Sequence, residues 1–131
     1  MKKIKQTIAF LLLSILTFTA CKKETSTFQP QVANQPDNFS FQTTNANNIT
    51  QSFEYTWTNT GTKANITIST QGHATQMDIK VYDAMGTEVY SNSLDNVGSF
   101  TTNPGTAGQW RIVVVFKNFN GNILVTVKKG V

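Results

Sequence analysis

The stretch Phe53-Glu54-Tyr55-Thr56-Trp57-Thr58 places an aromatic residue at every second position and polar residues between them. Side chains of a β-strand point alternately to the two faces of a sheet, so this spacing predicts a strand with one buried face and one solvent-exposed face. We expect the aromatic row to belong to the core, because the intervening residues suit a wet face. The alternative is that Phe53, Tyr55 and Trp57 form a surface that stacks on a sugar or on a partner's side chains.

The same alternation recurs on both sides of this stretch, and Gly, Asn, Asp and Thr fill the gaps. A tight turn at Asp83-Ala84-Met85-Gly86 separates two of the segments. The pattern predicts strands at residues 64–69, 77–82 and 87–90, with weaker candidates at 39–41 and 99–101.

The segment Trp110-Arg111-Ile112-Val113-Val114-Val115-Phe116 is apolar on both sides, as expected of a central strand covered on both faces. Asn118-Phe119-Asn120-Gly121 then predicts a hairpin connection to a last strand at 123–127. About eight short strands with no helical period predict an all-β fold, a single small antiparallel β-sandwich of jelly-roll or Greek-key type over residues 37–131.

The chain opens with the cationic segment Met1-Lys2-Lys3-Ile4-Lys5 and continues with an uncharged run over residues 8–18. This pattern predicts a signal peptide over residues 1–20, because the run is shorter than the roughly 20 residues of a membrane-spanning helix. Phe18-Thr19-Ala20-Cys21 resembles the lipobox of bacterial lipoproteins, which implies acylation of Cys21 and anchoring to a membrane of the cell envelope, on its periplasmic or surface face. Cys21 is the single cysteine, so the alternative is an ordinary signal peptide followed by a chance cysteine.

The formal net charge of +4 belongs to the whole chain. Removing Lys2, Lys3 and Lys5 from the 11 basic residues leaves eight against seven acidic ones, and from Asp37 onward the numbers are six and six. This neutral domain lacks the basic patch that a nucleic-acid partner requires. Residues 21–36 are polar, contain Pro30 and Pro36 and show no apolar period, so they predict a flexible tether behind the lipidated cysteine.

Three stretches resemble the bacterial pre-peptidase C-terminal (PPC) domain, a jelly-roll-like β-sandwich appended to exported proteins. They are Gly61–Ile68, Met77–Gly86 with its Asp-x-x-Gly turn, and Gly105–Val114 with its glycines before Trp110, followed by a last strand at 122–128. The resemblance covers residues 51–129. It implies a sandwich fold and an accessory role, and it brings no catalytic residues.

The sequence offers little for catalysis or metal binding. His73 is the single histidine, and the single cysteine lies outside the predicted domain. The sequence therefore offers no cysteine–histidine pair for nucleophilic catalysis and no ligand pattern for zinc. The carboxylates Asp78, Asp83, Glu88 and Asp95 are the candidates for acid-base work, and we interpret each as structural. A calcium site at Asp78, Asp83, Asp95 or Asn96 has no supporting spacing. We therefore predict no enzyme activity, no cofactor and no metal.

The candidate contact residues are aromatic. Tyr82 and Tyr90 have the opposite parity from Met77, Ile79, Val81 and Val89, so we expect them to be exposed and to meet across a hairpin, and Trp57 is the third candidate. The resulting hypothesis is a membrane-anchored, non-catalytic binding module for a protein or glycan partner. Its alternative is a structural or assembly component of the cell envelope.

Overall fold

The computed structural model describes residues 28–131, and every regular element in this range is a β-strand. All the strand pairs are antiparallel. The strands are β1 (Gln31–Gln35), β2 (Asn38–Asn59), β3 (Ala64–His73), β4 (Gln76–Tyr82), β5 (Glu88–Ser93), β6 (Gly98–Thr101) and β7 (Gly108–Lys129).

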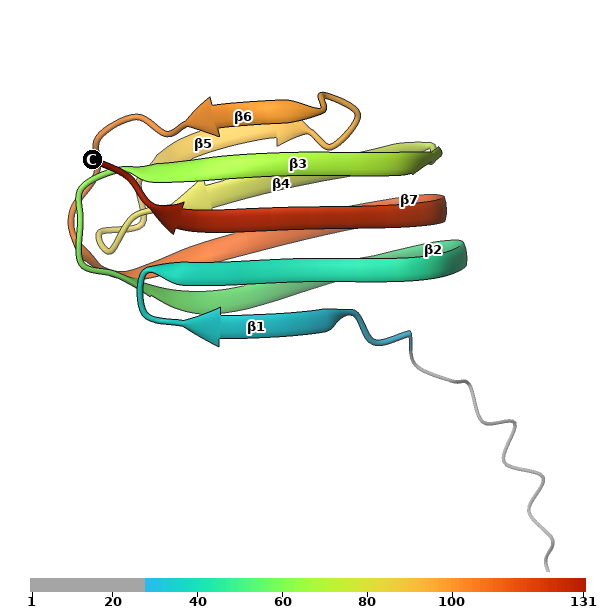
Figure 1. The fold of residues 1–131 in the computed structure, drawn as a ribbon, viewed down its shortest axis with the longest axis horizontal. Coiled ribbons are helices and arrows are strands. Elements are labelled where there is room, and N and C mark those ends of the chain that lie inside the picture. Colours follow the sequence, from blue (N-terminus) through green and yellow to red (C-terminus); the bar gives the residue numbers. More distant parts are fainter. Residues whose placement is uncertain (1–27) are drawn as a thin grey trace, which may run out of the picture.

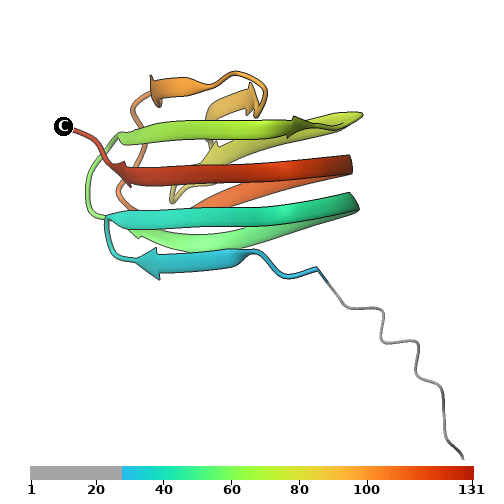
Figure 2. The same ribbon diagram turned by 45° about the vertical axis from the view of Figure 1, so that its right-hand side comes forward.

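The strands form two layers that lie face to face (Figures 1 and 2). One layer has the order β1, first part of β2, last part of β7, β3, β6. The other has the order last part of β2, first part of β7, β4, β5. The predicted all-β antiparallel sandwich is confirmed.

The two layers share their longest strands, because β2 and β7 bend and run from one layer into the other (Figure 1). Their pairing register shifts three times between Thr43 and Gln51. Asn45, Asn48 and Asn118 have positive φ angles there, a conformation that asparagine tolerates better than most residues. β3 and β4 pair with successive parts of β7 across the same bend.

The hairpin that we predicted at Asn118–Gly121 is therefore wrong. β7 continues from Gly108 to Lys129 through these residues. Asn118 has φ 52° and Gly121 has φ 131°, and these values serve a bend between layers, which uses the same residue types as a turn. For the same reason the predicted strands at 39–41 and 53–58 are parts of one strand, β2.

The predicted flexible tether is also wrong for residues 31–35, which form the edge strand β1. All five β1 side chains are exposed. Because neither face of β1 is buried, its sequence shows no alternation of apolar and polar residues. Its place is set by the backbone ladder to β2 and by Trp57, whose indole Nε1 donates to the carbonyl oxygen of Gln35 at 3.0 Å. The predicted signal peptide, Cys21 and residues 22–27 lie outside the described residues.

The core lies between the layers and is rich in aromatic residues. Trp57 and Trp110 are fully buried and meet edge to face, with ring centroids 6.0 Å apart. Phe53 is buried and Tyr55 is half-buried beside Phe39 and Phe41. The core interpretation of the aromatic row is confirmed, and Trp57 as a contact for a partner is wrong because no part of it is exposed.

Candidate binding surfaces

The residues considered for chemistry are dispersed over the sandwich. His73 is exposed at the end of β3, and Glu88, Asp95 and Asn96 are exposed on or near β5. Across residues 28–131, no group of three or more His, Cys, Asp or Glu side chains is close enough to hold a metal ion. The side chain of Asp78 accepts a hydrogen bond from the Gln76 amide at 2.8 Å.

Asp83 has a structural role, as its turn position predicts. Its buried carboxylate accepts hydrogen bonds from the backbone N–H groups of Thr106 at 2.8 Å, Thr87 at 2.8 Å and Met85 at 3.0 Å. These bonds, the one from Thr106 first, hold the pKa of Asp83 below its ordinary value of 3.8. The carboxylate thus ties the β4–β5 turn to the segment that precedes β7.

The two candidate tyrosines have different surroundings. Tyr82 is half-buried, and the guanidinium carbon of Arg111 lies 4.2 Å from the centre of its ring, a cation–π contact. Arg111 also lies 3.4 Å from the carboxylate of Glu54. Tyr82 therefore belongs to a charged surface stripe that crosses three strands of the four-stranded layer.

Tyr90 instead closes the side of the sandwich between β5 and β6. Its ring packs on Phe100, 6.1 Å between centroids, and its hydroxyl accepts a hydrogen bond from the Asn92 amide at 3.0 Å. Burial raises the pKa of its hydroxyl. A register shift between Val81 and Tyr82 pairs Tyr90 with Val81 and Tyr82 with Glu88, so the expected cross-strand meeting of the two tyrosines is wrong.

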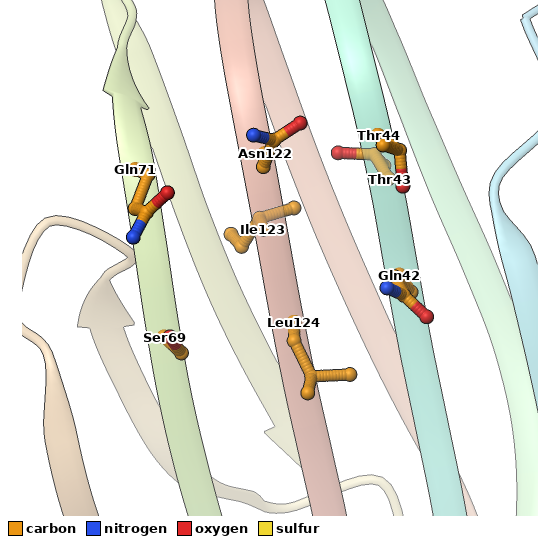
Figure 3. A pocket seen from close by; sticks show the side chains of 8 residues that line it. All are labelled: Gln42, Thr43, Thr44, Ser69, Gln71, Asn122, Ile123 and Leu124. Carbon is orange, nitrogen blue, oxygen red and sulfur yellow. The ribbon is translucent and has the colours of Figure 1, made fainter.

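The structure adds a hollow of about 340 Å³ that sequence reasoning missed, on the outer face of the five-stranded layer (Figure 3). It spans neighbouring positions of β2, β7 and β3, where Leu124 is paired with Gln42 on one side and Ser69 on the other, and Asn122 is paired with Gln71. Its lining residues are Gln42, Thr43, Thr44, Ser69, Gln71, Asn122, Ile123 and Leu124. We call it the amide pocket.

None of the residues that line the amide pocket is charged. The side chains of Gln42, Gln71 and Asn122 are exposed, and Leu124, 39% exposed, lies between them. The carbonyl oxygen of the Asn122 amide accepts a hydrogen bond from the backbone N–H of Asn45 at 2.7 Å, which ties one wall to the bend. Such a surface offers donors and acceptors around a small apolar patch, which suits a neutral polar ligand.

The amide pocket has no signature in the linear sequence. Its side chains come from three strands that are far apart along the chain, and each strand alone shows only the ordinary polar face of a sheet. Asn and Gln are frequent at residues 42–51 and 118–122, but that these segments lie side by side depends on the pairing of β7 with both β2 and β3.

Comparison with known proteins returns little. No protein-family model matches the chain, and no curated protein matches it. Among solved structures, a chain of the Glycosylation Associate Protein (Gap123) complex from Streptococcus agalactiae is similar, with a TM-score of 0.37 and 8% sequence identity. The likeness covers 77% of this chain and 39% of that chain, so this chain spans less than half of its length. Within residues 28–131, none of the elements is a helix of the length and hydropathy that a membrane span needs.

Proposed function

We propose that this chain is an exported lipoprotein of the bacterial cell envelope whose β-sandwich is a non-catalytic binding module. The proposal for export and anchoring rests on the cationic start, the apolar run and Cys21. An acyl anchor with two or more chains holds a protein stably on a membrane. The structured domain begins near the anchor, because seven residue steps separate Cys21 from Phe28 and span at most about 25 Å.

The amide pocket is the observation that supports a binding role. Its uncharged amide and hydroxyl groups around Leu124 favour a neutral ligand rich in hydroxyl groups, such as a saccharide, over an anion. It lies near the end of the sandwich where β2 and β7 bend, which is also the end at which the chain joins β1 (Figure 1). A short tether would thus hold the pocket close to the surface that carries the anchor.

Two measurements on the full chain test the two parts of this proposal. Metabolic labelling with a radioactive fatty acid should label the chain, and Cys21→Ser should abolish the label. If the Cys21→Ser variant is labelled as strongly as the unaltered chain, the anchoring proposal fails.

For binding, the full chain is screened on an array of neutral saccharides, with Gln71→Ala and Leu124→Asp as pocket variants. Loss of one hydrogen bond to a neutral ligand should weaken binding roughly three- to tenfold. Gln109→Ala, which alters an exposed amide on the other layer, serves as the matched control. A saccharide signal that all three variants retain would remove the amide pocket from consideration.

The second candidate function is a structural or assembly role in the envelope, in which a neighbouring protein packs against the sandwich. It is favoured by an apolar groove beside β1, which is lined by Phe28, Val32 and Tyr55. Cross-linking in intact cells separates the two functions. A stoichiometric neighbour supports assembly, and a freely diffusing monomer argues against it.

A further inference from the structure

The apolar groove is a hollow of about 300 Å³ between the chain segment that leads into β1 and the last part of β2. Apolar side chains from both segments line it, together with two glutamines. These residues are Phe28, Val32, Phe53, Tyr55, Gln29 and Gln51. Val32 is 37% exposed and Phe28 and Tyr55 are half-buried, so the apolar lining reaches the surface.

The groove runs along a strand edge. From Gln51 to Asn59, β2 is paired with β7 on one side. On the other side, the carbonyl oxygen of Thr58 accepts a bond from the backbone N–H of Asp37 at 2.9 Å, and that of Thr56 accepts one from the Asn34 amide at 2.8 Å. Asn34 and Asp37, next to the turn between β1 and β2, thus already supply donors to this edge of β2.

The carbonyl groups of Thr56 and Thr58 point away from β7. This orientation determines where the backbone groups of Ser52 and Glu54 point. In an antiparallel strand, alternate residues point their N–H and C=O groups to the same side. The backbone groups of Ser52 and Glu54 therefore point away from β7, at the edge of β2 beside the groove, and among residues 28–131 no strand pairs with them there. The line of bonds stops where the apolar groove begins.

We propose that an extended peptide of a partner protein adds to β2 at this edge as a further strand. Its backbone pairs with Ser52 and Glu54 and continues the bonds made at Thr56 and Thr58, and one apolar side chain enters the groove between Val32 and Tyr55. Strand addition of this kind takes affinity from main-chain hydrogen bonds and specificity from pockets for alternate side chains. A lipid chain would fill the groove and leave the backbone groups unpaired, so the edge favours a peptide. The proposal does not depend on the saccharide role of the amide pocket.

The test uses the full chain in lipid nanodiscs and a fluorescein-labelled heptapeptide of alternating threonine and valine. Anisotropy should report saturable binding, and deuterium exchange of residues 51–55 should slow when the peptide is added. A second heptapeptide, N-methylated at alternate nitrogens, keeps the side chains but loses half of its donors. It should bind at least tenfold more weakly.

A pair of variants at one position isolates the strand edge. Glu54→Pro removes the outward N–H, which an edge strand tolerates, and Glu54→Thr removes the same Arg111 contact and keeps the N–H. Glu54→Pro should weaken binding at least tenfold, and Glu54→Thr should bind within twofold of the unaltered chain. Val32→Lys, at an exposed position of β1, tests the groove if Glu54→Pro does not fold.

Four binding results would each overturn the proposal, and so would one result without peptide. They are no saturable binding up to about 1 mM peptide, equal binding of the N-methylated peptide, equal binding by folded Glu54→Pro and Glu54→Thr, and unchanged binding by Val32→Lys. If residues 51–55 are protected without peptide in a concentration-dependent dimer, a second copy of this chain occupies the edge and the peptide proposal falls. Loss of saccharide binding alone would leave these measurements unaffected.

Discussion

Gly72 lies directly opposite Gly121 at the bend of the sandwich, and neither position has room for a Cβ atom. A Cβ on Gly72 would overlap the backbone oxygen of Asn120, and one on Gly121 would overlap that of Gln71. The two backbones approach closely here because β3 and β7 both leave the five-stranded layer at this point. The pair is therefore a steric requirement of the bend.

Gly72→Ala should lower the free energy of unfolding by about 3 kcal/mol, at the upper end of the cost of overpacking, because the obstructing atoms are backbone. Gly86→Ala is the matched control, since nothing lies within 4 Å of its Cβ and its cost comes from φ +81° alone, about 1 kcal/mol. Urea denaturation of the full chain measures both. Equal losses would show that the bend relaxes around the new methyl group.

Thr43→Val should raise the free energy of unfolding by about 1 kcal/mol. Thr43 is 3% exposed, and its hydroxyl has no hydrogen-bond partner among the described residues. Valine has nearly the same shape and removes the cost of an unsatisfied buried polar group. Thr44→Val at the neighbouring exposed position should change stability by less than about 0.5 kcal/mol. Destabilisation by Thr43→Val would indicate that the hydroxyl has a partner, such as a buried water.

Asp83→Asn should lower the melting temperature at neutral pH, and the difference from the unaltered chain should shrink in acid. The folded-state pKa of Asp83 lies below its ordinary value of 3.8. The contribution of the Asp83 carboxylate to the free energy of unfolding is therefore complete above pH 3.8 and is lost as pH falls through the folded-state pKa. Asp95→Asn, at an exposed position, should have little effect at either pH. A difference for Asp83→Asn that stays constant from pH 7 to pH 2 would contradict the prediction.

Some acid sensitivity should remain in the Asp83→Asn variant. The pKa of Asp37 is also lowered, chiefly by the backbone N–H of Thr60 and then by its hydroxyl, each at 2.7 Å from the carboxylate. The ionised carboxylate of Asp37 therefore also stabilises the fold, and this stabilisation is also lost as pH falls. A double variant with Asp37→Asn should be less sensitive to acid than either single variant.

Trp57→Phe should loosen β1 specifically. The change removes the bond from the indole to Gln35 and leaves a small cavity, with a cost of about 2 kcal/mol. Trp110→Phe is the matched control, because its indole donates to the carbonyl oxygen of Thr106 instead, at 2.7 Å. Hydrogen exchange should rise at residues 31–35 in the first variant and near Thr106 in the second. The same exchange pattern in both would show that neither bond acts locally.

Much of the fold was predictable because the core faces of the strands obey a period of two. Trp57, Ile66 and Ile79 are each buried where the alternation puts them. The prediction that residues 110–116 are covered on both faces is wrong, because Arg111 is exposed and Val113 and Val115 are half-buried. The other errors occurred at Asn118–Gly121 and at β1. Asn and Gly occur both where a chain reverses and where a strand bends, so local sequence could not tell a hairpin from a bend. An exposed edge strand has no buried apolar residues, so local sequence could not tell β1 from a tether.

The candidate surfaces were less predictable than the fold. The parity that marked Tyr82 and Tyr90 as exposed was wrong for both, because each is half-buried. At Tyr90 the pairing carries a register shift between Val81 and Tyr82, and the ring packs on Phe100. A bulge of this kind adds one residue to one strand and reverses the faces beyond it. Neither the amide pocket nor the apolar groove could be read from any single strand.

By itself, the sequence determined the strand class, the faces of most strands and the zero net charge of the domain, because alternation and composition are local properties. It also carries the signal and Cys21, which remain predictions. Only the tertiary structure decided that β2 and β7 each serve both layers, that Gly72 must face Gly121, and that Phe53 and Tyr55 line an apolar groove with Phe28 and Val32. These features depend on pairing between distant segments, and a register is a relation between strands that no strand specifies alone.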